Sequence, residues 1–410
     1  MTINPFFKNK GPFKIEKLLK LSGIDNNENF IKSKISDIRD LSTAIKDNIT
    51  FFHSKKYETL ASTTKASFCI TTDNLSETLP KSCKKIIVSN VLIATAKITK
   101  TFYPNAVLDN FDDNLKDINK TSYKKKVKHG QNVLIGKNIK IGKNCLIGHN
   151  TILESDIVIG DNCSIGSNVI LRNTIVKNNV NILDGCIVGK KGFGFFPDTK
   201  ENFRYPHIGI VIINKNSEIG CGSTIDRGSL SNTIIGKNTY LDNQIHIAHN
   251  VKIGDNCIIA GQVGFAGSST IGNQVMIGGQ AGVSGHLKIG NKVNIGGGSG
   301  VIRNISDNCK VMGYPAKDLR KEQKFTKGQE IVDYLYGARA KHRVVGYLDV
   351  AEGVTDEILI TLKDITKDLE ISEFVEFLKE IEDFFSGEYQ IKLPRNEDYN
   401  FAIYDVYKKS

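Results

Sequence analysis

The chain has 410 residues, enough for two or three domains, and it contains no apolar run near the ~18 residues that a membrane span needs. Residues 1–20 are interrupted by lysines and show no signal-peptide pattern, so we expect a cytoplasmic protein. The net charge is +11, with +18 on residues 1–330 and −7 on residues 331–410, which suits an anionic partner; no nucleic-acid-binding motif is present.

Residues 1–104 are predicted to form an α/β domain. Apolar residues at helical spacing predict helices over 13–21 and 91–102, and short apolar runs at 66–71 and 85–88 predict buried strands. Residues 105–129 form a polar linker that ends in a basic run.

The domain over residues 130–315 carries an apolar residue at every sixth position. The first series is Ile135, Ile141, Ile147, Leu153, Ile159, Ile165 and Leu171. The phase is lost after Leu171, and a second series runs from Ile235 to Val301. A period of six, with small residues following the apolar ones, is typical of a parallel β-helix in which three hexapeptides make one coil of 18 residues.

The repeat is interrupted by a loop over residues 187–209. The loop contains Gly192-Phe193-Gly194-Phe195, and exposed aromatic side chains are costly unless they cover something. We therefore expect this loop either to bind a ligand or to pack on a neighbouring subunit.

The end of the chain is predicted to hold a short helix over residues 316–330 and an acidic appendage over residues 331–410. Within the appendage, 344–350 reads as a strand, and the apolar stripe over 371–384 reads as an amphipathic helix. An oligomer cap, a regulatory module and a protein-contact surface all fit this appendage.

A candidate catalytic group lies in the second series of repeats. Asp242 precedes His249 by seven residues, and an acid beside an imidazole fixes its tautomer and stabilises its charged form, as a general base requires. Gly267 follows His249 by 18 residues and should stack on it in the next coil, offering a backbone N–H without a side chain. His286 follows by two coils and one residue.

Three runs within the repeats carry a more specific resemblance: 224–228 (TIDRG), 242–250 (DNQIHIAHN) and 284–286 (SGH). Together they resemble the UDP-3-O-acylglucosamine N-acyltransferases of lipid A biosynthesis, and the likeness covers roughly residues 12–320. It implies a left-handed parallel β-helix and a homotrimer with its site between subunits. The implied reaction moves a 3-hydroxyacyl group from the phosphopantetheine thioester of acyl carrier protein to the 2-amine of the UDP-sugar, with no further cofactor.

The resemblance also implies roles for individual residues. The catalytic set is His249 as the base with Asp242, the Gly267 N–H as oxyanion donor, and His286. Substrate binding falls to Phe51 and Tyr57, which would stack on the uracil, and to Ser54, Asn243 and Gln244. Carrier binding falls to Phe193, Phe195 and Arg303. Ser54 departs from the asparagine that the family pattern has there, and Phe51 and Tyr57 also fit a purely core role.

Three other functions remain open on the sequence alone. A sister O-acyltransferase would use the same fold on a hydroxyl acceptor. A zinc enzyme of the γ-carbonic-anhydrase type would use His246, His249 and His286, although we expect no metal and the eight cysteines show no C-x-x-C spacing. A non-catalytic scaffold would need none of these groups.

Overall fold

The computed structural model describes residues 4–24, 33–196 and 202–313, together with the backbone of three strands at 347–349, 389–392 and 405–408. The chain divides into two compact units, Met1–Tyr314 and Pro315–Ser410. The helices predicted over residues 316–330 and 371–384 lie outside the described residues.

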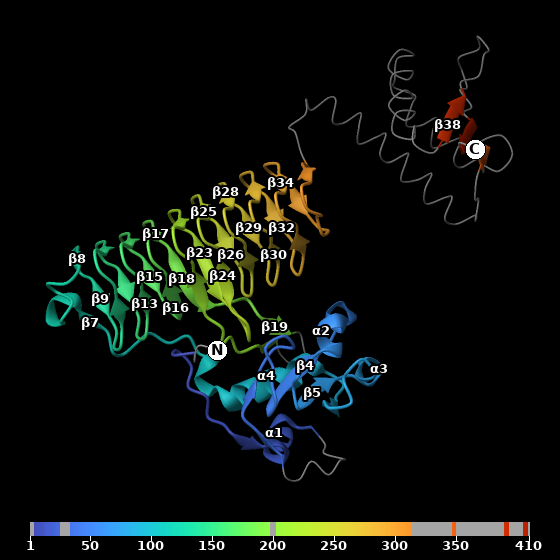
Figure 1. The fold of residues 1–410 in the computed structure, drawn as a ribbon, viewed down its shortest axis with the longest axis horizontal. Coiled ribbons are helices and arrows are strands. Elements are labelled where there is room, and N and C mark those ends of the chain that lie inside the picture. Colours follow the sequence, from blue (N-terminus) through green and yellow to red (C-terminus); the bar gives the residue numbers. More distant parts are fainter. Residues whose placement is uncertain are drawn as a thin grey trace. The chain divides into compact units, whose positions relative to one another are not determined.

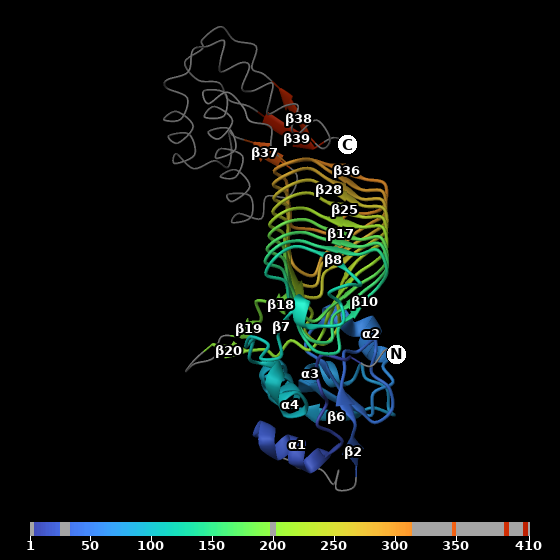
Figure 2. The same cartoon turned by 90° about the vertical axis from the view of Figure 1, so that its left-hand side faces the viewer.

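The first unit is built on a parallel β-helix, whose coils run from β8 in teal to β34 in orange (Figure 1) and are seen edge-on in Figure 2. Among the described residues, sheet 1 has ten strands, sheet 2 has ten and sheet 3 has eight. Sheet 1 comprises β7 (Lys116–Asp117), β9 (Leu134–Ile135), β12 (Ile152–Leu153), β15 (Ile170–Leu171), β18 (Ile187–Lys191), β23 (Thr224–Arg227), β26 (His246–Ile247), β29 (Gly264–Phe265), β32 (Gly282–Val283) and β35 (Gly300–Val301).

Sheets 2 and 3 form the other two sides of each coil. Sheet 2 comprises β8 (Lys128–His129), β11 (Leu146–Ile147), β14 (Ser164–Ile165), β17 (Asn181–Ile182), β22 (Glu218–Ile219), β25 (Tyr240–Leu241), β28 (Ile258–Ile259), β31 (Met276–Ile277), β34 (Asn294–Ile295) and β36 (Lys310–Val311). Sheet 3 comprises β10 (Lys140–Ile141), β13 (Val158–Ile159), β16 (Thr174–Val176), β21 (Val211–Ile213), β24 (Thr233–Ile235), β27 (Lys252–Ile253), β30 (Thr270–Ile271) and β33 (Lys288–Ile289). The pairs are parallel throughout, apart from β7 with β9 at the start.

The repeat builds this shape through its inward side chains and its corners. The sixth-position residues point inward and are buried, as Ile247 and Phe265 are in adjacent coils. The corners require a left-handed backbone, and asparagine, which tolerates that conformation best after glycine, often occupies them, as Asn144 and Asn162 do. Their side-chain amides also hydrogen-bond from coil to coil, at 3.1 Å for this pair. The predicted hexapeptide β-helix is confirmed.

The loss of phase after Leu171 has a structural reason. Ile170 pairs with Ile187, so this coil is one residue short of 18. Thr224 pairs with His246, so that coil is four residues longer than 18, and the extra residues lie at the corner between β23 and β24. Coil arithmetic from the sequence therefore fails in this region.

The N-terminal region holds a four-stranded parallel sheet of β3 (Asp37–Ile38), β4 (Asn48–Phe52), β5 (Phe68–Thr71) and β6 (Lys84–Ile87), and a small pair of β1 (Phe13–Lys14) with β2 (Lys34–Ile35). Its helices are α1 (Ile15–Ser22), α2 (Glu58–Ser62), α3 (Asp73–Ser76) and α4 (Val91–Phe102), and its 3₁₀ turns are η1 (Lys55–Tyr57) and η2 (Pro104–Ala106), with η3 (Ile118–Lys120) in the linker. The helix predicted over 91–102 is confirmed. The first helix begins two residues late, because Phe13 and Lys14 pair with β2.

The N-terminal region packs on the base of the excursion loop. Tyr205, Ile208 and Leu230 are buried in one cluster with the apolar residues of α1 and α4. The loop itself forms a short hairpin of β19 (Phe195–Phe196) and β20 (Phe203–Arg204).

The second unit contains an antiparallel sheet in the order β37 (Tyr347–Asp349), β39 (Asp405–Lys408) and β38 (Tyr389–Lys392), and β37 confirms the strand predicted over 344–350. None of the helices in the described residues is long and apolar enough to cross a bilayer.

Candidate active site

The imidazole of His249 lies at the corner that follows β26, outside the coil, and is half-buried. Its Nδ1 is 2.9 Å from Oδ1 of the next residue, Asn250. Asn250 is itself buried, and its own backbone N–H donates to Thr233 Oγ1 at 2.9 Å. The ring of His249 is therefore oriented by a neutral amide.

The two ends of the Asn250 amide are identified by their other partners. The backbone N–H of Ser229, which can only donate, lies 3.0 Å from Oδ1, and the Ser229 hydroxyl lies 2.8 Å from the same atom. The backbone carbonyl of Ser231, which can only accept, lies 3.0 Å from Nδ2, and Ser231 Oγ lies 2.7 Å from it. Because Oδ1 must accept, Nδ1 of His249 carries the proton and Nε2 has the free lone pair. This is the tautomer of a general base.

Both serines come from the corner that contains the four extra residues. That corner, between β23 and β24, passes beside Asn250, so a lengthened turn supplies the hydrogen bonds that orient the amide. The sequence shows the run His249-Asn250, but Ser229 and Ser231 lie 21 and 19 residues before Asn250, off the 18-residue register. Sequence reasoning missed Ser229 and Ser231 for this reason, and it assigned no role to Asn250 although that residue follows His249 directly.

Two glycines pack on the His249 ring. A Cβ on Gly267 would lie 2.7 Å from Cε1 of His249 and 2.8 Å from Nε2, and a Cβ on Gly192 would lie 2.7 Å from the His249 Cβ. The predicted stacking of Gly267 over His249 is confirmed, since the N–H of Ser268 donates to the His249 carbonyl at 2.9 Å. Within the described residues, the Gly267 N–H has no backbone acceptor of its own.

The prediction that Asp242 orients the His249 ring is wrong. Asp242 lies at the preceding corner, after β25, where its Oδ2 would be 3.1 Å from a Cβ on Gly261. Among the described residues of one chain, no hydrogen bond or ion pair joins Asp242 to His249, and Nδ1 is held by Asn250. The reason is geometric: seven residues carry the chain along one side of a triangular coil, and successive corners face different directions. Any catalytic role of Asp242 stays a prediction.

The structure brings the N-terminal aromatic run to the β-helix. Tyr57 Oη and His286 Nδ1 are 2.7 Å apart, and the rings of Phe51, His53 and Tyr57 follow one another at centroid distances of 5.7 and 5.5 Å. Burial, followed by Lys56 and His249, lowers the pKa of His286, and burial raises the pKa of Tyr57, so both side chains are uncharged at neutral pH. The structure thus brings together three of the predicted site residues: Phe51, Tyr57 and His286.

Comparison with known proteins identifies the family of this chain. The family model of UDP-3-O-(3-hydroxymyristoyl) glucosamine N-acyltransferase matches residues 32–101, and the model of the bacterial transferase hexapeptide matches residues 138–173 and 232–267. The UDP-3-O-acylglucosamine N-acyltransferase 2 of Legionella pneumophila strain Paris is 38% identical over 251 residues, 60% of this chain and 73% of the relative. The chain belongs to the UDP-3-O-acylglucosamine N-acyltransferase family. It is an acyltransferase, and the predicted family and enzyme class are confirmed.

Solved structures also resemble this N-acyltransferase. The UDP-N-acetylglucosamine acyltransferase from Campylobacter jejuni is 19% identical, with 63% of this chain and 96% of that chain covered and a TM-score of 0.41. The corresponding protein of Acinetobacter baumannii is 23% identical, with 62% and 96% covered and a TM-score of 0.36.

Two predicted substrate residues of the N-acyltransferase belong to the corner that holds Asp242. Gln244 Oε1 accepts from Gln262 Nε2 at 2.9 Å in a ladder that continues to Gln280, and Asn243 Oδ1 accepts from the backbone N–H of Cys221 at 2.7 Å. These contacts stabilise the corner, and the role of both residues in substrate binding stays a prediction. Ser54 Oγ accepts from the N–H of Lys56 and so caps η1.

The predicted carrier-binding residues lie on the surface. Phe193 is 82% exposed, and its ring centroid is 5.0 Å from that of Phe195, over which the Arg204 guanidinium lies at 4.1 Å. Arg303 is exposed beyond β35. An exposed phenylalanine next to a cation is suited to a partner that has both apolar and anionic parts.

The three histidines of the zinc hypothesis have separate partners. Nδ1 of His246 is 2.7 Å from Thr224 Oγ1, whereas Nδ1 of His249 contacts Asn250 and Nδ1 of His286 contacts Tyr57. Within the part of the chain that the structure describes, no three His, Cys, Asp or Glu side chains form a group that could hold a metal ion.

Proposed function

We propose that this enzyme transfers a 3-hydroxyacyl group from the thioester of acyl carrier protein to the 2-amine of UDP-3-O-(3-hydroxyacyl)glucosamine, with His249 as the general base. One observation carries the proposal: the Ser229–Asn250–Ser231 contacts leave Nε2 of His249 as the unprotonated nitrogen. Base catalysis of this kind contributes roughly 10²–10⁴-fold to the rate.

The reaction needs no enzyme nucleophile, because the sugar amine attacks the thioester carbonyl carbon directly. As the C–N bond forms, the carbonyl oxygen becomes an oxyanion and Nε2 of His249 takes a proton from the amine nitrogen. The oxyanion then re-forms the carbonyl, the C–S bond breaks, and the departing sulfur receives the proton from His249. For this reason the proposal includes no cofactor beyond the carrier's phosphopantetheine.

The oxyanion would be received by the Gly267 backbone N–H. That N–H has no backbone acceptor in the described residues and belongs to the glycine that lies against His249. Removing one oxyanion donor costs about 3–4 kcal/mol in enzymes where the effect has been measured. His286, uncharged and held by Tyr57, would steady the sugar or the developing charge.

The nucleotide and the carrier would bind on two sides of His249. Phe51 and Tyr57 offer their rings to the uracil, as the family pattern implies, while Ser54 is occupied in capping η1. Phe193 and Phe195 in the excursion loop would contact the pantetheine arm, and Arg303 would pair with the carrier's phosphate.

A homotrimer acting in the cytoplasm is part of the proposal. The outward positions Gly264, Gly282 and Gly300 stand in register on sheet 1, and a Cβ at each would meet no atom within 4 Å, which makes a flat face suited to packing on another copy. Light scattering on the purified protein should report three times 45.3 kDa.

An acyl-transfer assay tests the whole proposal. The protein is incubated with 3-hydroxyacyl carrier protein and either UDP-3-O-acylglucosamine or UDP-N-acetylglucosamine, and mass spectrometry identifies an amide or an ester product. We expect the amide only, and a loss of roughly 10²–10⁴-fold in His249→Ala but not in His246→Ala. An ester product would favour the sister O-acyltransferase, and an active His249→Ala variant would exclude this base.

A further inference from the structure

A second histidine, which the proposed mechanism does not use, lies against the base. The ring of His207 is 5.1 Å from the ring of His249, with an interplanar angle of 60°. His207 is 1% exposed, and within the described residues its ring nitrogens make no hydrogen bond of good geometry, although the Tyr205 backbone lies close enough to favour the charged ring. Buried polar groups are nearly always well paired, so a poorly paired imidazole beside a reactive one calls for an explanation.

His207 is confined on its other sides. A Cβ on Gly194 would lie 2.7 Å from Cε1 of His207, so the excursion loop rests directly on the ring, and the ring of Tyr205 lies 6.3 Å away, edge-on. The His207 carbonyl accepts from Nε of Arg227 at 3.0 Å.

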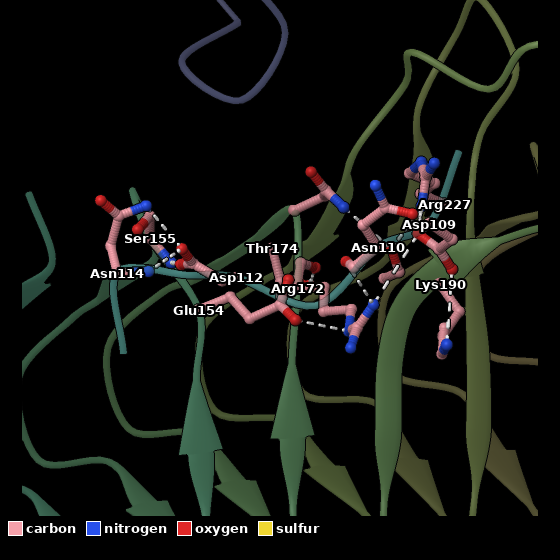
Figure 3. A network of polar contacts seen from close by, with 12 residues as sticks. Asp109, Asn110, Asp112, Asn114, Glu154, Ser155, Arg172, Thr174, Lys190 and Arg227 are labelled. Carbon is pink, nitrogen blue, oxygen red and sulfur yellow. Dashed lines mark hydrogen bonds and ion pairs between the residues drawn. The ribbon is translucent and has the colours of Figure 1, made fainter. Parts of the chain in front are cut away.

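Arg227 fixes the segment that carries His207 to the rest of the molecule. Its Nη1 donates to Asp109 Oδ1 at 3.1 Å and to the Gly189 carbonyl at 3.2 Å (Figure 3). Lys190 also reaches Asp109, at 3.5 Å. Burial by itself would raise the pKa of Asp109, but Arg227 and the neighbouring cations lower it, so the anchor is charged at neutral pH.

His207 carries no charge at neutral pH. Burial first, and then His249 and Arg227, lower the pKa of His207 to about 3. An uncharged ring does not oppose the proton that His249 accepts during the reaction. An unsatisfied buried polar group costs about 1–3 kcal/mol, so fold stability does not account for the choice of residue.

We propose that His207 is a positioning residue for the base: its uncharged ring fills the space between Gly194 and His249, holds the His249 ring on Gly267, and keeps water from its face. The inference rests on the proposed role of His249 as the base. The ionisable rings beside His249 are His207, from the excursion segment, and His286, with Lys56 behind it. Arg227 and Arg204 lie behind His207.

The test is the pH profile of kcat/KM for three proteins: wild type, His207→Ala and His207→Gln. Removing the ring should let His249 tilt and admit water, so we expect kcat to fall roughly 10–100-fold with the KM for the sugar nucleotide unchanged. Because water stabilises the imidazolium, the acid limb of the profile should move to higher pH by about 0.5–1 pH unit. The flat, neutral glutamine should keep kcat within about threefold and the limb in place.

A purely structural role would lower the melting temperature or the fraction of active enzyme without moving the acid limb. Gly194→Ala adds a Cβ that presses on the His207 ring without removing it. It provides a second test if His207→Ala does not fold. It too should lower kcat and move the acid limb of the kcat/KM profile to higher pH. A wild-type pH profile in both His207→Ala and Gly194→Ala overturns the inference. So does a loss in His207→Gln equal to that in His207→Ala, since packing would then not be the cause.

The wild type separates the two proposals. If it has no N-acyltransferase activity, or if His249→Ala keeps its acid limb, the proposed function fails. If both behave as expected and His207→Ala matches the wild type, only the role of His207 fails.

Discussion

His249 Nδ1 and Asn250 Oδ1 lie 2.9 Å apart, and the oxygen is identified by a backbone N–H that can only donate to it. An amide oxygen accepts the same Nδ1–H hydrogen bond that a carboxylate would accept, but it brings no negative charge. The amide therefore orients the ring without the attraction that a carboxylate would exert on an imidazolium. This suits a base that takes a proton from an amine and passes it to a leaving sulfur.

Substitution of Asn250 tests this orientation. Asn250→Ala leaves both tautomers of His249 accessible and the ring free to rotate, so kcat/KM should fall roughly 10–100-fold. Asn250→Asp keeps the acceptor and adds a charge, so the acid limb of the kcat/KM profile should move to higher pH. Steady-state kinetics across pH 5–9 measures both effects.

Ser231→Ala is the matched control, because it removes only one of the two partners of Asn250 Nδ2 and leaves the Ser231 carbonyl in place. Its kcat/KM should stay within about threefold of the wild type. An Asn250→Ala enzyme with undiminished kcat/KM would exclude the amide as the orienting group.

Gly267 should tolerate no side chain. In Gly267→Ala the new Cβ would meet the His249 ring at 2.7–2.8 Å and push it from its position, so kcat should fall at least about 100-fold while the fold is retained. Gly313→Ala, after β36, where a new Cβ would meet no atom within 4 Å, is the control and should behave like the wild type. Kinetics together with thermal melts would decide; equal effects of the two substitutions would point to general disruption of the coil.

Tyr57 offers separate tests of its ring and its hydroxyl. If the ring stacks on the uracil, Tyr57→Ala should weaken UDP binding by about 1–3 kcal/mol, roughly 5–150-fold in Kd. Tyr57→Phe keeps the ring but loses the 2.7 Å contact with His286, so UDP binding should be nearly unchanged. Calorimetric titration with UDP measures both. Full affinity in Tyr57→Ala would place this ring in the core alone.

The charged network along the linker predicts a pH-dependent stability. Glu154 Oε1 lies 2.8 Å from Arg172 Nε (Figure 3), yet burial outweighs this ion pair and raises the pKa of Glu154 to about 7. Because the folded state holds this proton more tightly than the unfolded state, the resulting stability is complete below about pH 4.5 and lost as pH rises to about 7.

Glu154→Gln mimics the protonated acid, so it should match the wild type near pH 4.5 and melt about 2–6 °C higher above pH 7. Differential scanning calorimetry at both pH values measures the difference. Asp113→Asn, at an exposed position of the linker, is the control. A Glu154→Gln protein that melts lower than the wild type above pH 7 would show that the ion pair with Arg172 outweighs burial.

The hexapeptide register is strong enough to predict most of the scaffold from the sequence. An apolar residue at every sixth position is buried by a coil of three hexapeptides, so the β-helix and the stacking of Gly267 on His249 follow from counting. The sequence also shows the aromatic residues Phe51 and Tyr57. No pattern in the sequence, however, indicates that Tyr57 contacts His286, which lies 229 residues further along the chain.

Only the tertiary structure decided what surrounds the His249 ring. Four extra residues at one corner bring Ser229 and Ser231 to Asn250, and an irregular loop brings His207 to the other side of the ring. Asp242 appeared close in sequence, but a triangular coil turns it toward another corner. A repeat determines where the backbone goes, because each coil must pair with the next; insertions obey no such rule, and their contacts are set by packing in three dimensions.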